Sequence, residues 1–321
     1  MPLTHTRDLF AKALKGKYAL GAFNVNNMEL LQAIIEACEE EKAPVMLQIS
    51  KGARQYAHPV YLKKLIEAAV SLSTIPIAVH LDHGDSFELC KQCIDEGFTS
   101  VMIDASHEKF DDNIRICREV VDYAHKRNCV VEGELGMLVG AQHDDGEEGG
   151  GYSKGGCYTH PDEAVDFVKR SGVDSLAVAI GNSHGAYKFE GEQHLDLERL
   201  KAIKKALLDA GMGDYPLVLH GASSVPKDLA DEINRYGGKL GDKTKGVPEA
   251  DIEVARRVGC TKVNIDTDLR LAMTAAIRKV FAETPKEFDP RKYLAPARAK
   301  VKELVRHKVR DVLCCAGHAF D

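Results

Sequence analysis

Features that would indicate a membrane, secreted or nucleic-acid-binding protein are missing from this chain of 321 residues. No apolar run is long enough to cross a bilayer, so we expect no membrane partner. Residues 1–17 have a charged amphipathic pattern without the apolar core of a secretory signal, and the expected compartment is therefore the cytoplasm. The net charge is −6 with both signs mixed throughout, and no basic stripe is present. Binding to a phosphate backbone needs such a stripe, so nucleic acid is excluded as a partner.

A disulfide framework is missing as well. Nine cysteines are an odd number, and they are scattered along the chain. Cys90 and Cys93 have the spacing of a redox or zinc pair, but they lie in a predicted helix, FELCKQCIDEG, and no second pair follows at zinc-ribbon spacing. We therefore expect reduced thiols, with Cys90 and Cys93 on one face of this helix.

Eight short apolar segments alternate with longer amphipathic segments along the chain. Near-continuous apolar runs are typical of strands that are buried on both faces of a parallel sheet. The segments between them have apolar residues on one helical face. The expected strands are residues 19–27, 44–50, 77–84, 100–106, 130–136, 175–181, 216–222 and 262–268. This alternation predicts an α/β protein, a (β/α)8 TIM barrel that forms a single domain over residues 1–321.

An open, doubly wound sheet is the alternative fold. Such a sheet carries a glycine-rich phosphate turn after its first strand. The corresponding segment here, NVNNMELL, contains no glycine. The closed barrel is therefore the expected fold.

Polar side chains gather at the C-terminal ends of the expected strands, whereas the N-terminal ends show no such grouping. Barrel active sites lie at the C-terminal mouth, so these side chains predict one converging site. They are Asn24, Ser50, Asp82, His83, Glu134, His220, Asn264 and Asp266.

Three of the histidines belong to this pattern: His83 lies at the end of the third strand, His184 lies three residues past the sixth, and His220 lies within the seventh. Each one alone is better explained as a hydrogen-bonded core histidine. Three neutral imidazoles at one barrel level, with an open fourth position, predict a catalytic zinc site. His80 precedes His83 in the same strand, and side chains alternate along a regular strand. We therefore expect His80 to face the other side and to be structural or to support the ligands.

The runs IPIAVHLDHG, VEGELG, GNSHGAYKF, LHGASS and KVNIDTD closely resemble those of the class II fructose-bisphosphate aldolases, which include tagatose-bisphosphate aldolases. The resemblance covers essentially the whole chain, from GAFNVNN to FDPRKYLAPAR. It implies a zinc-dependent lyase of glycolysis and gluconeogenesis that reversibly cleaves fructose 1,6-bisphosphate to dihydroxyacetone phosphate and glyceraldehyde 3-phosphate. It also implies a homodimer or homotetramer, and it allows a second divalent or a monovalent cation.

The resemblance assigns zinc ligation to the three histidines His83, His184 and His220, and metal binding to Glu134 when the zinc shifts or a second ion is present. It assigns acid–base work on the hydroxyl at the scissile bond to Asp82. The chemistry requires these parts, because aldol cleavage leaves negative charge on the ketone oxygen and a proton must leave the C4 hydroxyl. A class I aldolase would use a lysine Schiff base instead. Lys188 and Lys262 lie near strand ends, but the three histidines favour the metal.

The resemblance also assigns the substrate contacts. Glycine-containing runs beside the metal ligands can form an anion nest from backbone N–H groups. Matched positions for the phosphate next to the ketone are Gly185, Lys188, Gly221, Ser223, Asp266 and Thr267; those for substrate hydroxyls are Asn264 and Asp266; those near the distal phosphate are Ser50 and Arg270. An ordinary surface arginine on a helix is an equally good interpretation of Arg270.

The run after the fifth strand, GELGMLVGAQHDDGEEGGG, departs from the family pattern. Gln142 stands where the pattern needs another residue, and an amide cannot act as a base. The acidic pair between glycines offers Glu148 as the base at the ketone carbon, with Glu147, Asp145 and Asp144 as the open alternatives. The density of glycine predicts a mobile active-site loop over about residues 137–160.

Three other functions compete with this interpretation. A barrel hydrolase of the amidohydrolase type uses an H-x-H pair at its first strand, which here ends in GAFNVNN. A tagatose-bisphosphate aldolase stays open, because the two sugars differ only at C4. A zinc-binding paralogue with lost or altered turnover also stays open, because the usual loop glutamate is missing.

Overall fold

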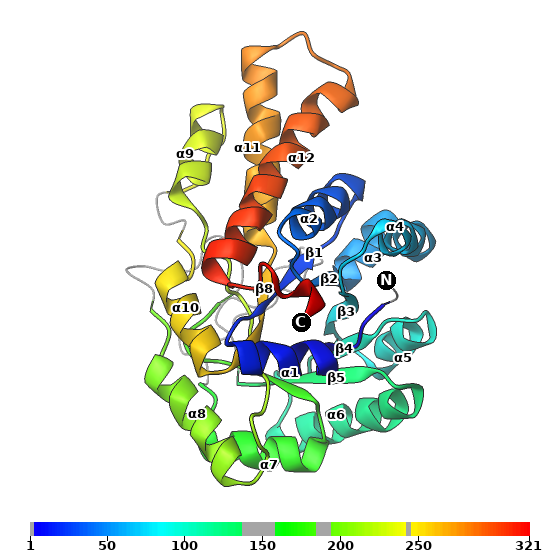
Figure 1. Cartoon of the computed structure of the whole chain (residues 1–321), viewed down its shortest axis with the longest axis vertical. Coiled ribbons are helices and arrows are strands. Elements are labelled where there is room, and N and C mark those ends of the chain that lie inside the picture. The colour runs from blue at the N-terminus through cyan, green and yellow to red at the C-terminus, as the bar shows by residue number, and fades with distance from the viewer. Residues whose placement is uncertain (1–2, 137–157, 184–193, 242–244) are drawn as a thin grey trace.

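The computed structural model describes residues 3–136, 158–183, 194–241 and 245–321, and its strands form a closed parallel barrel (Figure 1). Each strand pairs with the next one along the chain, and β1 pairs with β8 to close the ring. The predicted eight-stranded barrel is therefore confirmed. Its strands are β1 (Leu20–Asn24), β2 (Val45–Ser50), β3 (Ile77–Gly84), β4 (Ser100–Ile103), β5 (Val130–Leu135), β6 (Ser175–Val178), β7 (Leu217–Leu219) and β8 (Cys260–Ile265).

Most strands end earlier than their apolar runs predicted. The seventh run was expected to extend to residue 222, but β7 ends at Leu219, and Gly221 has the left-handed φ of 56°. The eighth run was expected to extend to residue 268, but Thr267 already begins helix α11. The chain leaves the barrel wall at these points, so the polar end of the seventh run lies in a loop and that of the eighth run continues into the first turn of α11.

Helices surround the barrel, as the amphipathic segments predicted (Figure 1). Local capping sets several of their first turns, because side-chain oxygens accept otherwise unpaired backbone N–H groups. Asn27 caps α2, Ser86 caps α5 and Asp196 caps α8. These outer helices are α2 (Met28–Glu40), α3 (Lys51–Ala57), α4 (Pro59–Leu72), α5 (Phe87–Asp95), α6 (Phe110–Ala124) with the short η1 (His125–Arg127), α7 (Pro161–Ser171), α8 (Leu197–Asp209), α9 (Lys227–Arg235) and α10 (Glu249–Val258).

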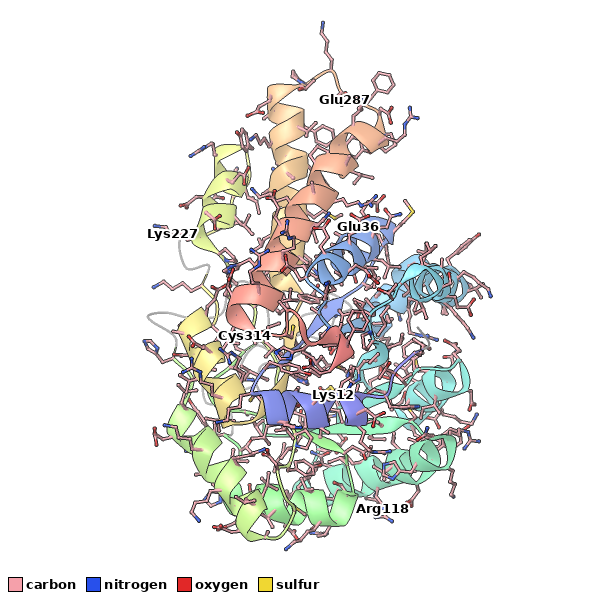
Figure 2. The ribbon with its side chains drawn as sticks, viewed as in Figure 1. Lys12, Glu36, Arg118, Lys227, Glu287 and Cys314 are labelled. Carbon is pink, nitrogen blue, oxygen red and sulfur yellow. The ribbon has the colours of Figure 1, made fainter. Side chains whose placement is uncertain are left out.

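The N-terminal end of the barrel is covered by the two ends of the chain. Helix α1 (Thr6–Gly16) lies across it, together with the segment that contains η2 (Lys308–Val312) and η3 (His318–Phe320). The Thr4 N–H donates to the Ile77 carbonyl at the start of β3, and the Ala19 N–H donates to the Leu313 carbonyl. Lys12 and Cys314 both lie on this side in Figure 2. A substrate site is therefore confined to the opposite end.

The last two long helices, α11 (Thr267–Glu283) and α12 (Pro290–His307), form a hairpin that extends beyond the barrel (Figure 1). Glu287 lies at its far end in Figure 2. Helix α12 packs against α2, and at its C-terminal end Arg306 Nε lies 2.8 Å from Oε1 of Glu41, the residue after α2. Among the described residues, no helix is both long and apolar enough to cross a membrane.

The cysteines agree with the expectation of reduced thiols. The eight cysteines in the described part of the chain are all free, and Cys157 lies outside it. Cys90 and Cys93 are both buried in α5. Burial raises the pKa of the Cys93 thiol to about 12, so this thiol is a poor nucleophile and a poor metal ligand.

Candidate metal centre and active site

Three predicted metal ligands meet at the C-terminal mouth of the barrel. One ligand atom each from His83, Glu134 and His220 lies within 4.8 Å of the others. They come from the end of β3, from β5 and from the residue after β7, and the two imidazole rings are 4.7 Å apart. His184, the third predicted histidine, lies outside the described residues. The structure thus brings together residues that are separated by up to 137 positions in the chain.

A carboxylate that the sequence analysis missed orients His83. Asp104 follows β4 directly, and its Oδ2 lies 2.7 Å from His83 Nδ1. Its other oxygen accepts the Ser106 N–H at 3.1 Å and the Ser106 hydroxyl at 2.8 Å. The position of Asp104 at a strand end was the available signal. Because Nδ1 faces Asp104, Nε2 is the ring nitrogen that a metal ion would use.

His220 is held between two glutamates of β5. Its Nδ1 lies 2.8 Å from Glu134 Oε2, and its Nε2 lies 2.8 Å from Glu132 Oε1. Glu134 belongs to the ligand cluster, so a metal ion held there would be bound by Nδ1, while Nε2 faces Glu132. The sequence analysis missed Glu132. The period of two along a strand was the available signal, because residues two apart face the same side.

The electrostatics of this cluster favour positive charge. Burial alone would lower the pKa of His83, but the carboxylates of Asp82 and Asp104 outweigh burial and raise it to about 10. Burial likewise opposes a charge on His220, and Glu134 and Glu132 outweigh it, so the pKa of His220 is also raised. The same surroundings would stabilise a divalent cation. Imidazole and carboxylate are the ligand types of many transition-metal sites, and the residues present therefore fit a metal.

Asp82 lies beside this cluster but does not belong to it. Its Oδ1 is 3.8 Å from His83 Nε2. Asn24 donates to Asp82 Oδ2 at 2.9 Å, and Asn264 donates to Oδ1 at 3.3 Å. Burial raises the pKa of Asp82, but the positive charges of His83 and Lys262 outweigh burial and hold it below its usual range. Asp82 is therefore an ionised, oriented carboxylate at the mouth.

His80 does not belong to the ligand cluster, which agrees with the structural or supporting role expected for it. The alternation of sides does not apply here, because the β3–β4 register shifts between Leu81 and Gly84 and His83 has a φ of 45°. His80 Nε2 lies 3.9 Å from Glu132 Oε2, and its Nδ1 lies 2.8 Å from the Ser100 hydroxyl. Burial and then Lys262 lower its pKa to about 3, so His80 is neutral.

Lys262 is fully buried inside the barrel, and its Nζ lies 3.0 Å from Glu132 Oε1. A lysine that forms a Schiff base must present an uncharged amine to the substrate carbonyl. This one is engaged in an ion pair below the mouth, which argues against that role.

Two loops that carry predicted phosphate contacts lie side by side. The Asp266 N–H donates to the Ser223 hydroxyl at 3.3 Å, which joins the loop after β7 to the start of α11 at Thr267. Gly221 has a φ of 56°, and a Cβ there would lie 2.2 Å from the Ser183 carbonyl oxygen. Only glycine fits this position without movement of the backbone.

The residues predicted for the distal phosphate lie on separate elements. Ser50 ends β2 opposite Asp82 of β3, and its Oγ accepts the Ala53 N–H at 3.1 Å, which leaves its hydroxyl hydrogen able to donate. Arg270 is half exposed, with its Nε 2.9 Å from Asp266 Oδ1. Gly185, Lys188 and Glu148 lie outside the described residues, as do residues 137–157 of the predicted loop.

A cavity of about 1280 Å³ lies elsewhere, between α9, residues 245–249 and α12. Ser224 and Val225 line it, whereas none of the three clustered metal ligands does. The chemistry of the side chains, rather than the size of a hollow, therefore locates the site.

Comparisons with known proteins agree with this geometry. The family model "Fructose-bisphosphate aldolase class-II" matches residues 4–318. A Treponema pallidum protein named fructose-bisphosphate aldolase is 49% identical over 99% of this chain and 98% of its own length. One of the same name from Giardia intestinalis is 50% identical over 100% of this chain and 96% of its own length.

A solved aldolase structure also resembles this chain along its whole length. The crystal structure of the YdjI aldolase from Escherichia coli K12 matches with a TM-score of 0.78 and 30% identity, over 99% of this chain and 100% of its own. The chain therefore belongs to the class-II fructose-bisphosphate aldolases, a family of metal-dependent carbon–carbon lyases that act on phosphorylated sugars.

Proposed function

We propose that this chain is a zinc-dependent aldolase that cleaves fructose 1,6-bisphosphate to dihydroxyacetone phosphate and glyceraldehyde 3-phosphate, with zinc held by His83, His184 and His220. Glu134 is the further carboxylate ligand in this proposal. The carrying observation is the cluster of His83, Glu134 and His220 within 4.8 Å, with the oriented carboxylate of Asp82 next to it. An imidazole-rich set with an open position is typical of catalytic zinc.

When bound, zinc supplies Lewis-acid stabilisation of the negative charge that develops on the ketone oxygen as the C3–C4 bond breaks. The chain's own residues do the remaining work. Asp82 takes the proton of the C4 hydroxyl while the C4 carbonyl forms, and it returns this proton in the condensation direction. Its low pKa keeps it ionised at neutral pH, and the amides of Asn24 and Asn264 hold both of its oxygens.

A second proton must be delivered to the C3 carbon of the ketone fragment. We assign this transfer to Glu148 on the loop after β5, with Glu147, Asp145 and Asp144 as the alternatives. The support is chemical: the transfer needs an acid–base group, and this loop carries carboxylates between glycines. A loop that closes over the substrate would bring the carboxylate to the carbon and exclude water.

The phosphate next to the ketone is assigned to the loops after β6 and β7 and to the start of α11. Gly185, Lys188, Gly221, Ser223, Asp266 and Thr267 make up this set, in which Asp266 contributes its backbone N–H, because a carboxylate would repel phosphate. The hydrogen bond between Asp266 and Ser223 and the glycine-only position at Gly221 support it. The last two strands are also the usual place for phosphate in TIM barrels.

The remaining substrate contacts are assigned to side chains around Asp82. Asn264 and Asp266 would bind substrate hydroxyls, and Ser50 and Arg270 would contact the distal phosphate. Because Arg270 is now paired with Asp266, its contact with phosphate requires this ion pair to open or to be shared.

We further assign the chain to the cytoplasm, as one barrel domain in a homodimer or homotetramer, with a second divalent or a monovalent cation as an additional ligand. These assignments follow from the sequence pattern and the family.

The test is cleavage of fructose 1,6-bisphosphate before and after removal of metal with a chelator. We expect activity to disappear on chelation and to return with zinc, and we expect borohydride with substrate to leave the enzyme active. Covalent trapping at a lysine would refute the mechanism. Faster cleavage of tagatose 1,6-bisphosphate would instead identify the stereoisomer as substrate, and zinc binding without cleavage of either sugar would identify a paralogue without this activity.

A further inference from the structure

We propose that the buried pair Lys262–Glu132 positions the imidazole of His220 and thereby sets the affinity of the site for its metal ion. The inference rests on the proposed function in one respect, since it takes His220 to be a metal ligand. Neither Lys262 nor Glu132 belongs to the ligand cluster. Both act through His220 and are positioning residues.

The geometry places Glu132 on the side of the imidazole that faces away from the metal ligands. Glu132 Oε1 lies 2.8 Å from His220 Nε2, while His220 Nδ1 faces the ligand Glu134 at 2.8 Å. A hydrogen bond at Nε2 fixes the rotation of the ring and keeps a proton on that nitrogen. Nδ1 then offers its lone pair to the metal.

Lys262 determines which of two histidines forms a hydrogen bond with Glu132. Two histidines lie around this carboxylate, because His80 Nε2 is 3.9 Å from Oε2 while His220 Nε2 is 2.8 Å from Oε1. Lys262 Nζ lies 3.0 Å from the same Oε1 and fixes that oxygen beside His220. Glu132 is only 1% exposed and Lys262 is 0% exposed, so water cannot replace either partner. A buried carboxylate needs such a partner, since an unpaired charge is costly inside a protein.

The arrangement is repeated at His83, where Asp104 binds Nδ1 at 2.7 Å. The difference lies in what supports the carboxylate. Asp104 is held by the backbone and hydroxyl of Ser106, two residues later, whereas Glu132 of β5 is held by a lysine from β8. The contact that holds Glu132 beside His220 therefore depends on the closure of the barrel. One substitution, at Lys262, can remove it.

The experiment measures zinc affinity rather than activity. Metal-free protein is titrated with zinc in competition with a chromophoric chelator, for the wild type, Lys262→Met, Glu132→Gln and Lys262→Arg. Loss of a residue that orients a metal-bound histidine typically weakens metal binding by about 10- to 100-fold, and we expect this loss for the first two variants. Lys262→Arg keeps the charge, and we expect it to recover most of the affinity.

The matched control is Lys308→Met. Lys308 is also buried, but it pairs with Asp268 at 3.0 Å and Glu249 at 2.7 Å, neither of which belongs to the ligand cluster. We expect this variant to lose thermal stability and to bind zinc as the wild type does. An equal loss of zinc affinity in Lys308→Met and Lys262→Met would overturn the proposal, because it would show a general effect of removing a buried ion pair.

The double variant Lys262→Met/Glu132→Gln covers the case in which a single variant does not fold, because it leaves no unpaired buried charge. Where both single variants fold and the pair acts as one unit, its loss of zinc affinity is smaller than the product of the two single losses. Where a single variant does not fold, wild-type zinc affinity in the double variant would overturn the proposal. The visible spectrum of the cobalt-substituted protein gives a second readout, and we expect it to shift in both single variants. Single variants that keep both the wild-type zinc affinity and the wild-type cobalt spectrum would contradict the inference.

Wild-type cleavage of fructose 1,6-bisphosphate is measured separately. An inactive wild type that shows the Lys262 dependence refutes only the proposed function. An active wild type whose zinc affinity does not depend on Lys262 refutes only the inference.

Discussion

Replacement of Asp82 by alanine is expected to remove most of the catalysis and to leave the metal in place. Proton transfer by a positioned side chain typically contributes about 100- to 10,000-fold, which corresponds to about 2.7 to 5.4 kcal/mol of the barrier. We expect kcat/KM for fructose 1,6-bisphosphate to fall by this amount. The zinc content is expected to stay at one per chain, because Asp82 is not among the clustered metal ligands.

The effect of the charge of Asp82 can be tested separately from the effect of its size. Gln48 donates to Asn24 Oδ1 at 3.0 Å, which turns the Asn24 Nδ2 toward Asp82. Asn264 also directs its Nδ2 to this carboxylate. In Asp82→Asn, one of these two donors faces an NH2 group and loses its acceptor, at a cost of about 1–3 kcal/mol in stability. We expect this variant to be as inactive as Asp82→Ala, although its side chain has nearly the native size.

The measurements are a coupled assay of triose phosphate formation and the zinc content by atomic emission. Asp95→Ala is the control, because Asp95 is an exposed carboxylate at the end of α5 that bonds to Lys91 and Tyr123. Activity within tenfold of the wild type in Asp82→Ala would refute its role as the base. Loss of stoichiometric zinc in that variant would make it a ligand or an essential support of one.

Three further predictions follow from the site and the core. Glu148→Gln is expected to slow solvent-proton exchange of dihydroxyacetone phosphate by about 100- to 10,000-fold, and Gln142→Ala is expected to have a mild effect. Near-native exchange in both Glu148→Gln and Glu147→Gln would exclude these glutamates as the base and leave Asp145 and Asp144. Gly221→Ala is expected to cost about 1–3 kcal/mol in urea unfolding and to weaken binding of inorganic phosphate, because its Cβ would meet the Ser183 carbonyl at 2.2 Å. Native protein at pH 8 is expected to react slowly with Ellman's reagent at Cys93, because burial raises its pKa to about 12 and leaves a thiolate fraction of about 10⁻⁴. Rapid labelling of Cys93 without denaturant, measured by peptide mapping, would contradict that burial.

The barrel and the main site residues were predictable because both depend on patterns that are local in the chain. Each apolar run followed by an amphipathic segment predicts one strand and one helix. Parallel strands with such connections close only in a few ways. Since a parallel barrel aligns all C-terminal strand ends, the position of a polar residue at or next to the C-terminal end of its own strand was enough to place Asp82, His83, Glu134 and His220 at one mouth.

Contacts between side chains of different strands could not be predicted from local patterns. Glu132 and Lys262 are both polar residues inside strands, and nothing local distinguishes a solvated side chain from a buried ion pair. Their pairing depends on β5 and β8 facing each other across the closed barrel. Asp104 was missed for a similar reason, because its importance comes from the 2.7 Å distance to His83 of another strand.

The sequence by itself determined the fold class, the end of the barrel where the polar residues meet and the residue types of the candidate metal site. Those properties follow from periodicity and from the fixed direction of parallel strands. Only the tertiary structure decided which nitrogen of each histidine faces the ligand cluster and how Asp82 is held. It also decided that the irregular end of β3 brings the ring of His83 next to that of His220, while His80 lies near Glu132. These outcomes depend on distances of a few ångströms between strands, and the chain acquires such distances only when the barrel closes.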